Sequence, residues 1–95
     1  MLHSQTQEVH KENSLQALGK RVRELRVKRG YSQESFADLC QVHRTFMGSI
    51  ERGETNLSFK NLLKLSSALG ITLSVLLAGV EKGAAELARS AQQKK

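Results

Sequence analysis

Apolar residues recur at intervals of three and four along most of the chain, the spacing that places them on one face of an α-helix. No stretch alternates apolar and polar residues over a useful length, so the pattern predicts no strand. Serine or threonine precedes several of these apolar runs and glycine follows them, as expected for helix caps. We therefore predict an all-α fold of five helices, over residues 15–29, 33–40, 44–52, 59–69 and 73–78.

The apolar faces of these helices can contribute to one shared core. A chain of 95 residues has room for a single domain, and a domain this small buries only about 60–65% of the surface that its unfolded chain exposes. Cys40 is the only cysteine, so no internal disulfide can form, and its place on an apolar face indicates a packing role. The residues expected to face inward are Leu15, Leu18, Val22, Leu25, Phe36, Ala37, Cys40, Met47, Ile50, Leu62, Leu65 and Leu69.

Three segments of the chain differ in composition. Residues 1–14 are polar and lack the apolar stretch of a secretory signal, and we expect them to form a disordered arm. Residues 15–80 hold the five predicted helices, and residues 81–95 form a tail whose helical composition makes a sixth helix feasible. The longest unbroken apolar run, Val75 to Ala78, is far too short for a transmembrane span, so we expect a cytoplasmic protein.

The chain is basic, with 15 Lys and Arg against 9 Asp and Glu and a formal net charge of +6. Such an excess favours a polyanionic partner, either nucleic acid or an anionic membrane surface. Residues 15–30 hold six of the basic side chains and one glutamate, although a solvated helix face would explain these charges equally well. Membrane-surface binding is the weaker interpretation, because the first helix has no wide apolar face left once the core is built.

The two short helices at 33–40 and 44–52, joined by about three residues, have the geometry of a helix-turn-helix. The run from Ser32 to Ala37, then Val42, then Ile50-Glu51-Arg52-Gly53 resembles the Cro and phage-repressor type family, the XRE family. Residues 43–53 are most similar to the small controller proteins of restriction-modification systems. The resemblance covers roughly Leu18 to Leu77 and implies a repressor-like domain that binds double-stranded DNA and regulates transcription.

A recognition helix reads bases through side chains near its N-terminal end and on its outer face. With Met47 and Ile50 inward, the third predicted helix turns Arg44, Thr45, Gly48 and Ser49 outward. Arg44 can form two hydrogen bonds with a guanine, or it can contact phosphate without reading a base. Thr45 and Ser49 can donate to or accept from either groove edge.

Four further residues complete the predicted DNA-contact set. Phe46 can contact a thymine methyl, or its ring can lie on a neighbouring helix. The resemblance implies that the Gln33 amide, beside the N–H groups that begin its helix, binds a phosphate and fixes the docking register. Arg52 and Asn56 follow the recognition helix and are expected to contact the DNA backbone.

Two positions depart from the family pattern and one ion pair is implied by it. His43 stands where many relatives carry a serine, threonine or aspartate cap, and Gln41 stands where many carry a glycine in the turn.

The helix dipole disfavours a negative charge at Glu51, near the C-terminal end of its helix. The resemblance implies that Arg26, from the end of the first helix, neutralises Glu51 as a partly buried structural pair.

The fifth predicted helix has more apolar residues than the core requires. Leu73 and Leu76 suffice to cover the core, which leaves Val75, Leu77 and Val80. Relatives commonly carry glutamate at the position of Val75. We predict that these three side chains form a two-fold homodimer interface, with the alternative that they pack beneath the tail of the same chain.

The sequence offers little support for an enzyme. His43 and Cys40 have no second ligand pair to complete a zinc site, no glycine-rich phosphate loop is present, and we expect no metal, cofactor or small-molecule ligand. A second function remains open, an antitoxin-type interaction module of the same fold whose main task is to bind a partner protein through the tail. A stoichiometric protein partner would distinguish that module from a regulator.

Overall fold

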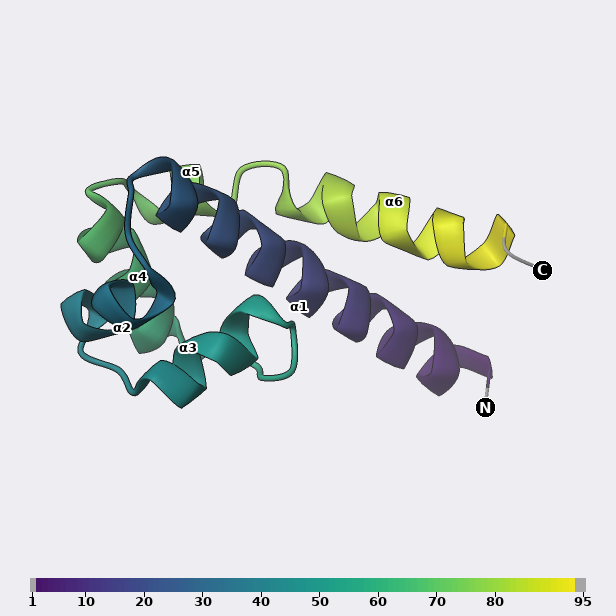
Figure 1. Ribbon diagram of the computed structural model, residues 1–95. Helices are drawn as coiled ribbons and strands as arrows, with labels where there is room; N and C mark the ends of the chain where they lie inside the picture. Colours follow the sequence, from purple (N-terminus) through teal and green to yellow (C-terminus); the bar gives the residue numbers. More distant parts are fainter. Residues whose placement is uncertain (1, 94–95) are drawn as a thin grey trace.

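The computed structural model describes the backbone of residues 2–93, with side chains over residues 13–90, and it contains six α-helices in that part of the chain. Figure 1 shows one long helix that crosses the molecule, with four shorter helices gathered around its C-terminal half and the last helix alongside its N-terminal half. The all-α prediction is confirmed, and the tail forms a sixth helix as far as Gln93; residues 94 and 95 lie outside the described residues. The helices are α1 (Leu2–Lys28), α2 (Gln33–Cys40), α3 (Arg44–Glu51), α4 (Phe59–Leu69), α5 (Leu73–Leu76) and α6 (Val80–Gln93).

Hydroxyl caps set the start of three of these helices, as the sequence predicts. The side chain of Ser32 accepts a hydrogen bond from the Ser35 amide at 3.0 Å, and Ser58 caps α4 in the same way. Thr72 caps α5 through the Val75 amide at 3.3 Å. Each cap satisfies one of the amides that the first turn of a helix leaves unpaired. The starts of α2, α4 and α5 therefore follow from local sequence alone.

The core lies where α1, α2, α3 and α4 meet. Its largest fully buried side chains are Phe36, Met47, Leu65, Leu76 and Val22, and most of the predicted inward residues are buried with them. Cys40 is among them, which confirms its packing role. Burial raises the pKa of this thiol to about 11, so the thiol stays protonated at neutral pH and behaves as a small apolar group.

Helices α1 and α3 cross at Gly19 with no side chain between their backbones. A Cβ atom on Gly19 would lie 2.4 Å from the carbonyl oxygen of Ile50 and 2.6 Å from that of Glu51. Distances this short are incompatible with any side chain, so glycine is required here for the close approach. The crossing brings the C-terminal turn of α3 directly onto the middle of α1.

The expectation of a disordered arm is not met over residues 2–14, which continue α1 as helix; Met1 lies outside the described residues. The N-terminal half of α1 has a partner in α6, whose free end lies on the same side of the molecule as the start of α1 (Figure 1). Ala17 and Ala84 are buried between the two helices, and a Cβ on Gly83 would meet the Ala17 methyl at 3.5 Å. Small side chains thus let α6 pack closely on α1, a tertiary contact that the polar composition of the arm does not reveal.

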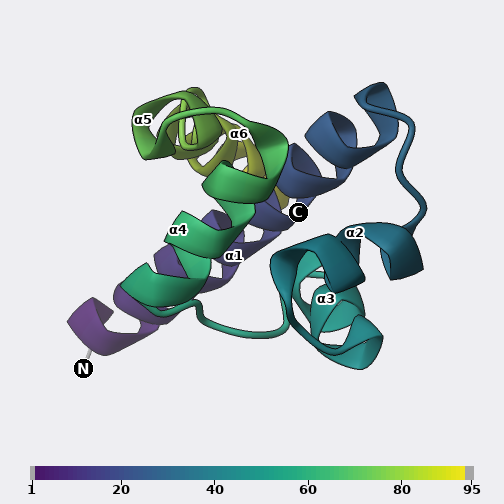
Figure 2. The same ribbon diagram turned by 90° about the vertical axis from the view of Figure 1, so that its left-hand side faces the viewer.

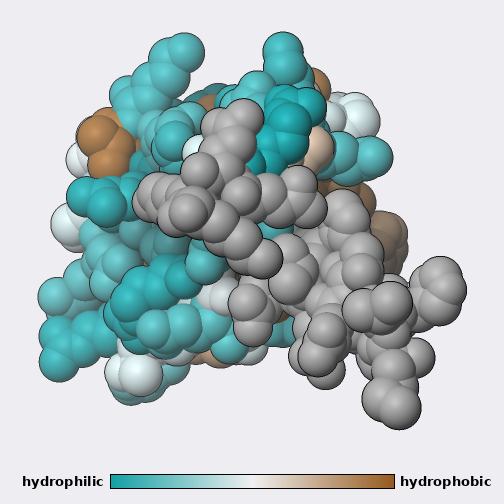
Figure 3. Space-filling view, turned by 90° about the vertical axis from the view of Figure 1, so that its right-hand side faces the viewer, coloured by the Kyte–Doolittle hydropathy of each residue, from teal (hydrophilic) through white to brown (hydrophobic). Residues whose placement is uncertain are grey.

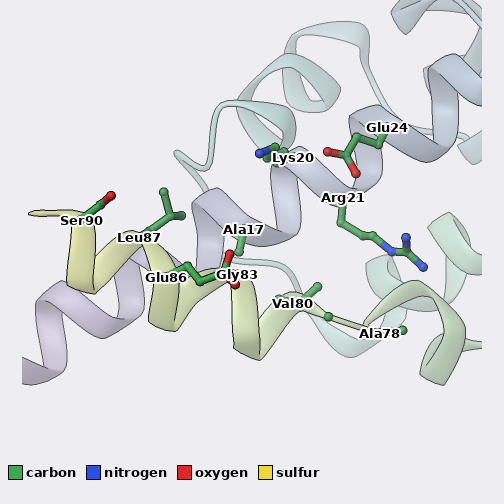
Figure 4. Close-up of a pocket in the computed structure, with 11 residues that line it drawn as sticks. Ala17, Lys20, Arg21, Glu24, Ala78, Val80, Gly83, Glu86, Leu87 and Ser90 are labelled. Atoms are coloured by element: carbon green, nitrogen blue, oxygen red, sulfur yellow. The ribbon is translucent and has the colours of Figure 1, made fainter.

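Arg21 connects α1 to the end of α5. Its Nε donates to the Leu76 carbonyl at 3.1 Å and its Nη2 to the Val75 carbonyl at 2.8 Å. A cation at a helix C-terminus satisfies free carbonyls and complements the helix dipole. Figure 4 shows Arg21 reaching from α1 toward the segment at Ala78, at the edge of a hollow of about 460 Å³ between α1 and α6.

No single helix in the described part of the chain is both long and apolar enough to cross a membrane. Residues 59–69 and 73–90 reach the required length and hydropathy only together, as a pair bent by 90°. The apolar side of that pair, with Leu65, Leu69 and Leu76, is buried in the core. Seen from the free end of the α1–α6 pair, the surface of the described residues is mostly hydrophilic, with small separate hydrophobic areas (Figure 3).

The Gly19 crossing gives a first prediction. We expect Gly19→Ala to lower the free energy of unfolding by roughly 1–3 kcal/mol, because the methyl group forces α1 and α3 apart. Gly83→Ala is the matched control, since its Cβ would make only ordinary contact with Ala17, and it should gain up to about 1 kcal/mol from helix propensity. Urea unfolding followed by circular dichroism measures both, and equal stability of the two variants would contradict the close-crossing argument.

Candidate nucleic-acid interface

A shallow hollow of about 490 Å³ lies between the start of α2 and the outer side of α3. Figure 2 shows these two helices side by side, with the turn between them. The hollow brings together four of the seven predicted DNA-contact residues with two others. Its lining residues are Gln33, Glu34, Arg44, Thr45, Gly48 and Arg52.

The local structure of α3 explains why its polar residues face this hollow. Met47 and Ile50 are buried, so the opposite side of the helix carries Arg44 and Thr45, both exposed. His43 fills the cap position, because its Nδ1 accepts a hydrogen bond from the Thr45 amide at 3.0 Å. Its imidazole thus replaces the usual hydroxyl or carboxylate cap.

The turn before α3 accepts Gln41 in a left-handed conformation, with φ 61° and ψ 41°. It is the only residue other than glycine with a positive φ in the described part of the chain. Its amide and that of Val42 donate to the Asp38 and Ala37 carbonyls, which closes the end of α2. A non-glycine residue in this region carries modest strain, and these two hydrogen bonds offset it.

Arg26 and Glu51 form a bidentate ion pair beneath the hollow. The Nε to Oε2 distance is 2.7 Å and the Nη2 to Oε1 distance is 2.9 Å, with 11% and 5% of the side chains exposed. The hydrogen bond with Glu51 raises the pKa of the Arg26 guanidinium above its ordinary value, against the opposing effect of burial. Arg26 also donates to the Tyr31 carbonyl at 2.9 Å, so its three donors hold α1, the loop after it and α3 together.

Glu51 also positions Gln33. The Gln33 Nε2 donates to the same Glu51 Oε1 at 3.2 Å, which links the first residue of α2 to the last residue of α3. The amide of Gln33 is half-buried at the edge of the hollow, with its Oε1 turned toward Gly48. This hydrogen bond is a feature that the sequence analysis did not predict.

The two arginines of the hollow are paired with exposed carboxylates. Arg44 Nη1 lies 3.5 Å from Glu34 Oε2, and both side chains are 67% exposed. Arg52 Nε lies 3.0 Å from Glu54 Oε2, with both side chains more than half exposed. Exposed pairs of this kind contribute about 0–1 kcal/mol each, so either arginine can leave its carboxylate for a stronger anion at little cost.

Three predicted DNA-contact residues lie outside the hollow. Phe46 is half-buried and packs against the core with part of its ring. Ser49 is half-buried on α3, and Asn56 is exposed in the loop after it, where its Oδ1 accepts from the Leu57 amide at 3.0 Å. Gly48 faces the hollow on the outer side of α3, as expected, and is buried there beneath the Arg52 and Gln33 side chains.

The three predicted interface residues differ in exposure. Val75 on α5 is 46% exposed. Leu77 and Val80 are half-buried and pack against the core, so part of their apolar surface already serves this chain. The structure thus leaves Val75 as the most available of the three for contact with a second chain.

Two residues make contacts that the sequence analysis did not predict. Glu34, in the first turn of α2, pairs with Arg44; the two residues are ten positions apart on different helices, so no helical periodicity reveals the pair. Arg21 was counted among the basic charges of the first helix, yet it caps α5. Among the described residues, no group of three or more His, Cys, Asp or Glu side chains could hold a metal ion.

Comparisons with known proteins agree with this geometry. A helix-turn-helix family model matches residues 22–76, which span α2, α3, α4 and α5 and the C-terminal part of α1. The control protein C.MunI of a Mycoplasma species is 48% identical over 65 residues, which cover 67% of this chain and 88% of that protein. The family match includes the residues of the hollow and both members of the Arg26–Glu51 pair.

Two solved structures are similar to this chain in fold. The restriction-modification controller protein C.AhdI from Aeromonas hydrophila superposes with a TM-score of 0.64 and 45% identity, over 65% of this chain and 94% of that chain. The clp gene regulator ClgR from Corynebacterium glutamicum superposes with a TM-score of 0.74 and 25% identity, over 85% of this chain and 84% of that chain. The family match ends before α6 begins.

The buried ion pair gives the second prediction. Arg26→Ala should lower the free energy of unfolding by roughly 3–5 kcal/mol, because it leaves the Glu51 carboxylate buried without a cation. Glu34→Gln breaks an ion pair whose members are both exposed, and it should change stability by less than about 1 kcal/mol. Thermal unfolding at equal salt concentration compares the two variants, and a negligible loss in Arg26→Ala would exclude a structural role for the pair.

Proposed function

This chain belongs to the helix-turn-helix family of DNA-binding transcription regulators, and on that premise we propose that it binds a two-fold operator as a homodimer of the controller-protein type. The observation that carries the proposal is the hollow that gathers Gln33, Arg44, Thr45 and Arg52 at the start of α2 and on the outer side of α3. In this class of protein, α3 lies in the major groove and the start of α2 meets the DNA backbone.

We assign the contacts within one half-site as follows. Arg44, at the first position of α3, is exposed and can form a bidentate pair with a guanine edge. Thr45 and Ser49 contact base edges or nearby phosphates along the same side of α3. Phe46 offers the groove only the part of its ring that the core does not cover.

Backbone contacts come from the residues around the recognition helix. The Gln33 amide, at the N-terminus of α2, binds a phosphate together with the free amides of that first turn. Its hydrogen bond to Glu51 supports this assignment, because it holds the amide in a fixed position before DNA arrives. Arg52 exchanges Glu54 for a phosphate, and Asn56 follows in the next loop.

The dimer forms around α5. Two recognition helices reach successive major grooves only when they are held about 34 Å apart, which a two-fold interface provides. Val75 is the exposed apolar centre of the proposed contact, with Leu77 and Val80 beside it in sequence. Arg21 supports the interface indirectly, since its hydrogen bonds to the Val75 and Leu76 carbonyls fix α5 on α1.

Base reading by Arg44 gives the third prediction. An operator is first selected from random duplex DNA. Arg44→Ala should then cost about 1–3 kcal/mol on that operator and remove the preference at one base position. Arg52→Ala should weaken binding to all sequences alike. It should also reduce the magnitude of the slope of log affinity against log salt concentration by about 1. An equal loss on every duplex with Arg44→Ala would assign this arginine to phosphate instead.

The interface gives the fourth prediction, and it tests the proposal as a whole. Val75→Glu should convert the dimer to a folded monomer, because two carboxylates would meet across the two-fold axis, and affinity for the full operator should fall toward that for a single half-site. Val27→Glu is the matched control, since Val27 is also an exposed valine but lies on α1. Sedimentation equilibrium and gel-shift titration measure the two effects. A native protein that is monomeric at micromolar concentration, with and without operator, would overturn the homodimer.

A further inference from the structure

A second surface, on the side of α4, has a different chemical character from the DNA-contact hollow. It is a groove of about 530 Å³ between α2 and α4, whose lining includes Leu39, Leu63, Lys60 and Lys64 over a floor with Cys40. Its lining residues and those of the hollow have no residue in common. The two surfaces can therefore be occupied at the same time.

Large apolar side chains are exposed along this groove. Leu39 is 48% exposed, Leu63 is 43% exposed, and Phe59, one helical turn before Leu63 on the same side of α4, is 66% exposed. The fold makes little use of them, because the inward side of α4 is formed by Leu62, Leu65 and Leu69. Single exposed apolar residues are ordinary on protein surfaces, but a group of three beside a groove is typical of an interaction site.

The charge at the groove has one sign. Lys60 and Lys64 are one turn apart on α4, and the other polar residues of the lining, Gln41 and Ser67, are neutral. Lys64 also lies close enough to Cys40 to lower the pKa of that thiol, against the larger effect of burial, so its ammonium group acts on the floor of the groove. The groove thus combines an apolar interior with a positive edge.

We propose that this groove binds an acidic amphipathic helix of a partner protein. Two apolar side chains of that helix, one turn apart, fill the space between Leu39 and Leu63, and carboxylates beside them meet Lys60 and Lys64. The 11 residues of α4 form a wall about 16 Å long, which matches roughly three turns of a docked helix.

The same observations argue against two other occupants. A second copy of this chain, docked groove to groove about a two-fold axis, would gather four lysines at one contact, which is unfavourable. DNA would satisfy the lysines, but its phosphate backbone offers no apolar group to Leu39, Leu63 and Phe59. Of the three occupants, only an amphipathic acidic helix matches both the exposed apolar side chains and the positive charge of the two lysines.

The test uses the full chain and a synthetic peptide of about 15 residues, with leucines on one helical face and glutamates beside them. A peptide of the same composition with the leucines spread around the helix, and one with lysine in place of each glutamate, are the controls. Of the three peptides, we expect only the acidic peptide with leucines on one face to bind at micromolar concentration. Its binding should shift the NMR amide signals of residues 39–41 and 60–67 of the protein. Equal binding of the scrambled peptide, or shifts confined to other residues, overturns the proposal.

Two double variants identify the groove as the site. Leu39→Ser with Leu63→Ser should weaken peptide binding by about tenfold, whereas Val27→Ser, an exposed residue on α1, should leave it unchanged. Lys60→Glu with Lys64→Glu should abolish binding of the acidic peptide and allow binding of the lysine peptide. Thermal unfolding checks that each variant folds, and unchanged affinity in the folded leucine variant overturns the proposal.

Operator DNA and self-association are measured with the same variants. One contrary outcome is that the double variant Lys60→Glu with Lys64→Glu loses as much DNA affinity as Arg52→Ala while it still binds the acidic peptide. In that case the groove is a DNA contact and the proposal fails. If the leucine variant changes the sedimentation of the free protein, the groove is an interface between copies and the proposal also fails. Failure of the peptide test leaves the DNA-binding function untouched, since the two surfaces are separate.

Discussion

The guanidinium of Arg26 and the carboxylate of Glu51 meet where α1, α2 and α3 converge. A carboxylate at the end of α3 is unfavourable by itself, because the helix dipole already places partial negative charge there. The bidentate contact neutralises it, and the third donor of Arg26 fixes the loop that leads into α2. Since the same carboxylate accepts a hydrogen bond from Gln33, one group determines both the packing of the three helices and the position of an amide at the proposed DNA contact.

The arginines of α1 divide into internal and external roles. Arg21 and Arg26 donate to α5, to α3 and to the loop before α2, whereas Arg23 and Arg29 are exposed. Part of the basic character that the sequence presents is therefore structural, and the remainder is available to a polyanion. Composition alone cannot separate these roles, because the direction of a guanidinium depends on which backbone carbonyls and carboxylates the fold brings within reach.

The fold could be predicted from the sequence where its determinants are local. Hydroxyl caps at Ser32, Ser58 and Thr72 and the spacing of apolar residues located α2, α4, α5 and most of the core. The extent of α1 could not be predicted, because its N-terminal half gains its partner, α6, from the far end of the chain. For the candidate site, the outward residues of α3 followed from the burial of Met47 and Ile50, but the Glu34–Arg44 and Gln33–Glu51 contacts depend on the angle between two helices.

The crossing at Gly19 has a mechanical consequence. Because backbone meets backbone there, with no side chain whose rotation could absorb a displacement, α3 cannot tilt independently of α1. Helix α1 has 27 residues, a rod about 40 Å long, and its far half is held by α6. A displacement of that remote half is therefore transmitted through the crossing, so we expect α1, α3 and α6 to move together as one rigid unit.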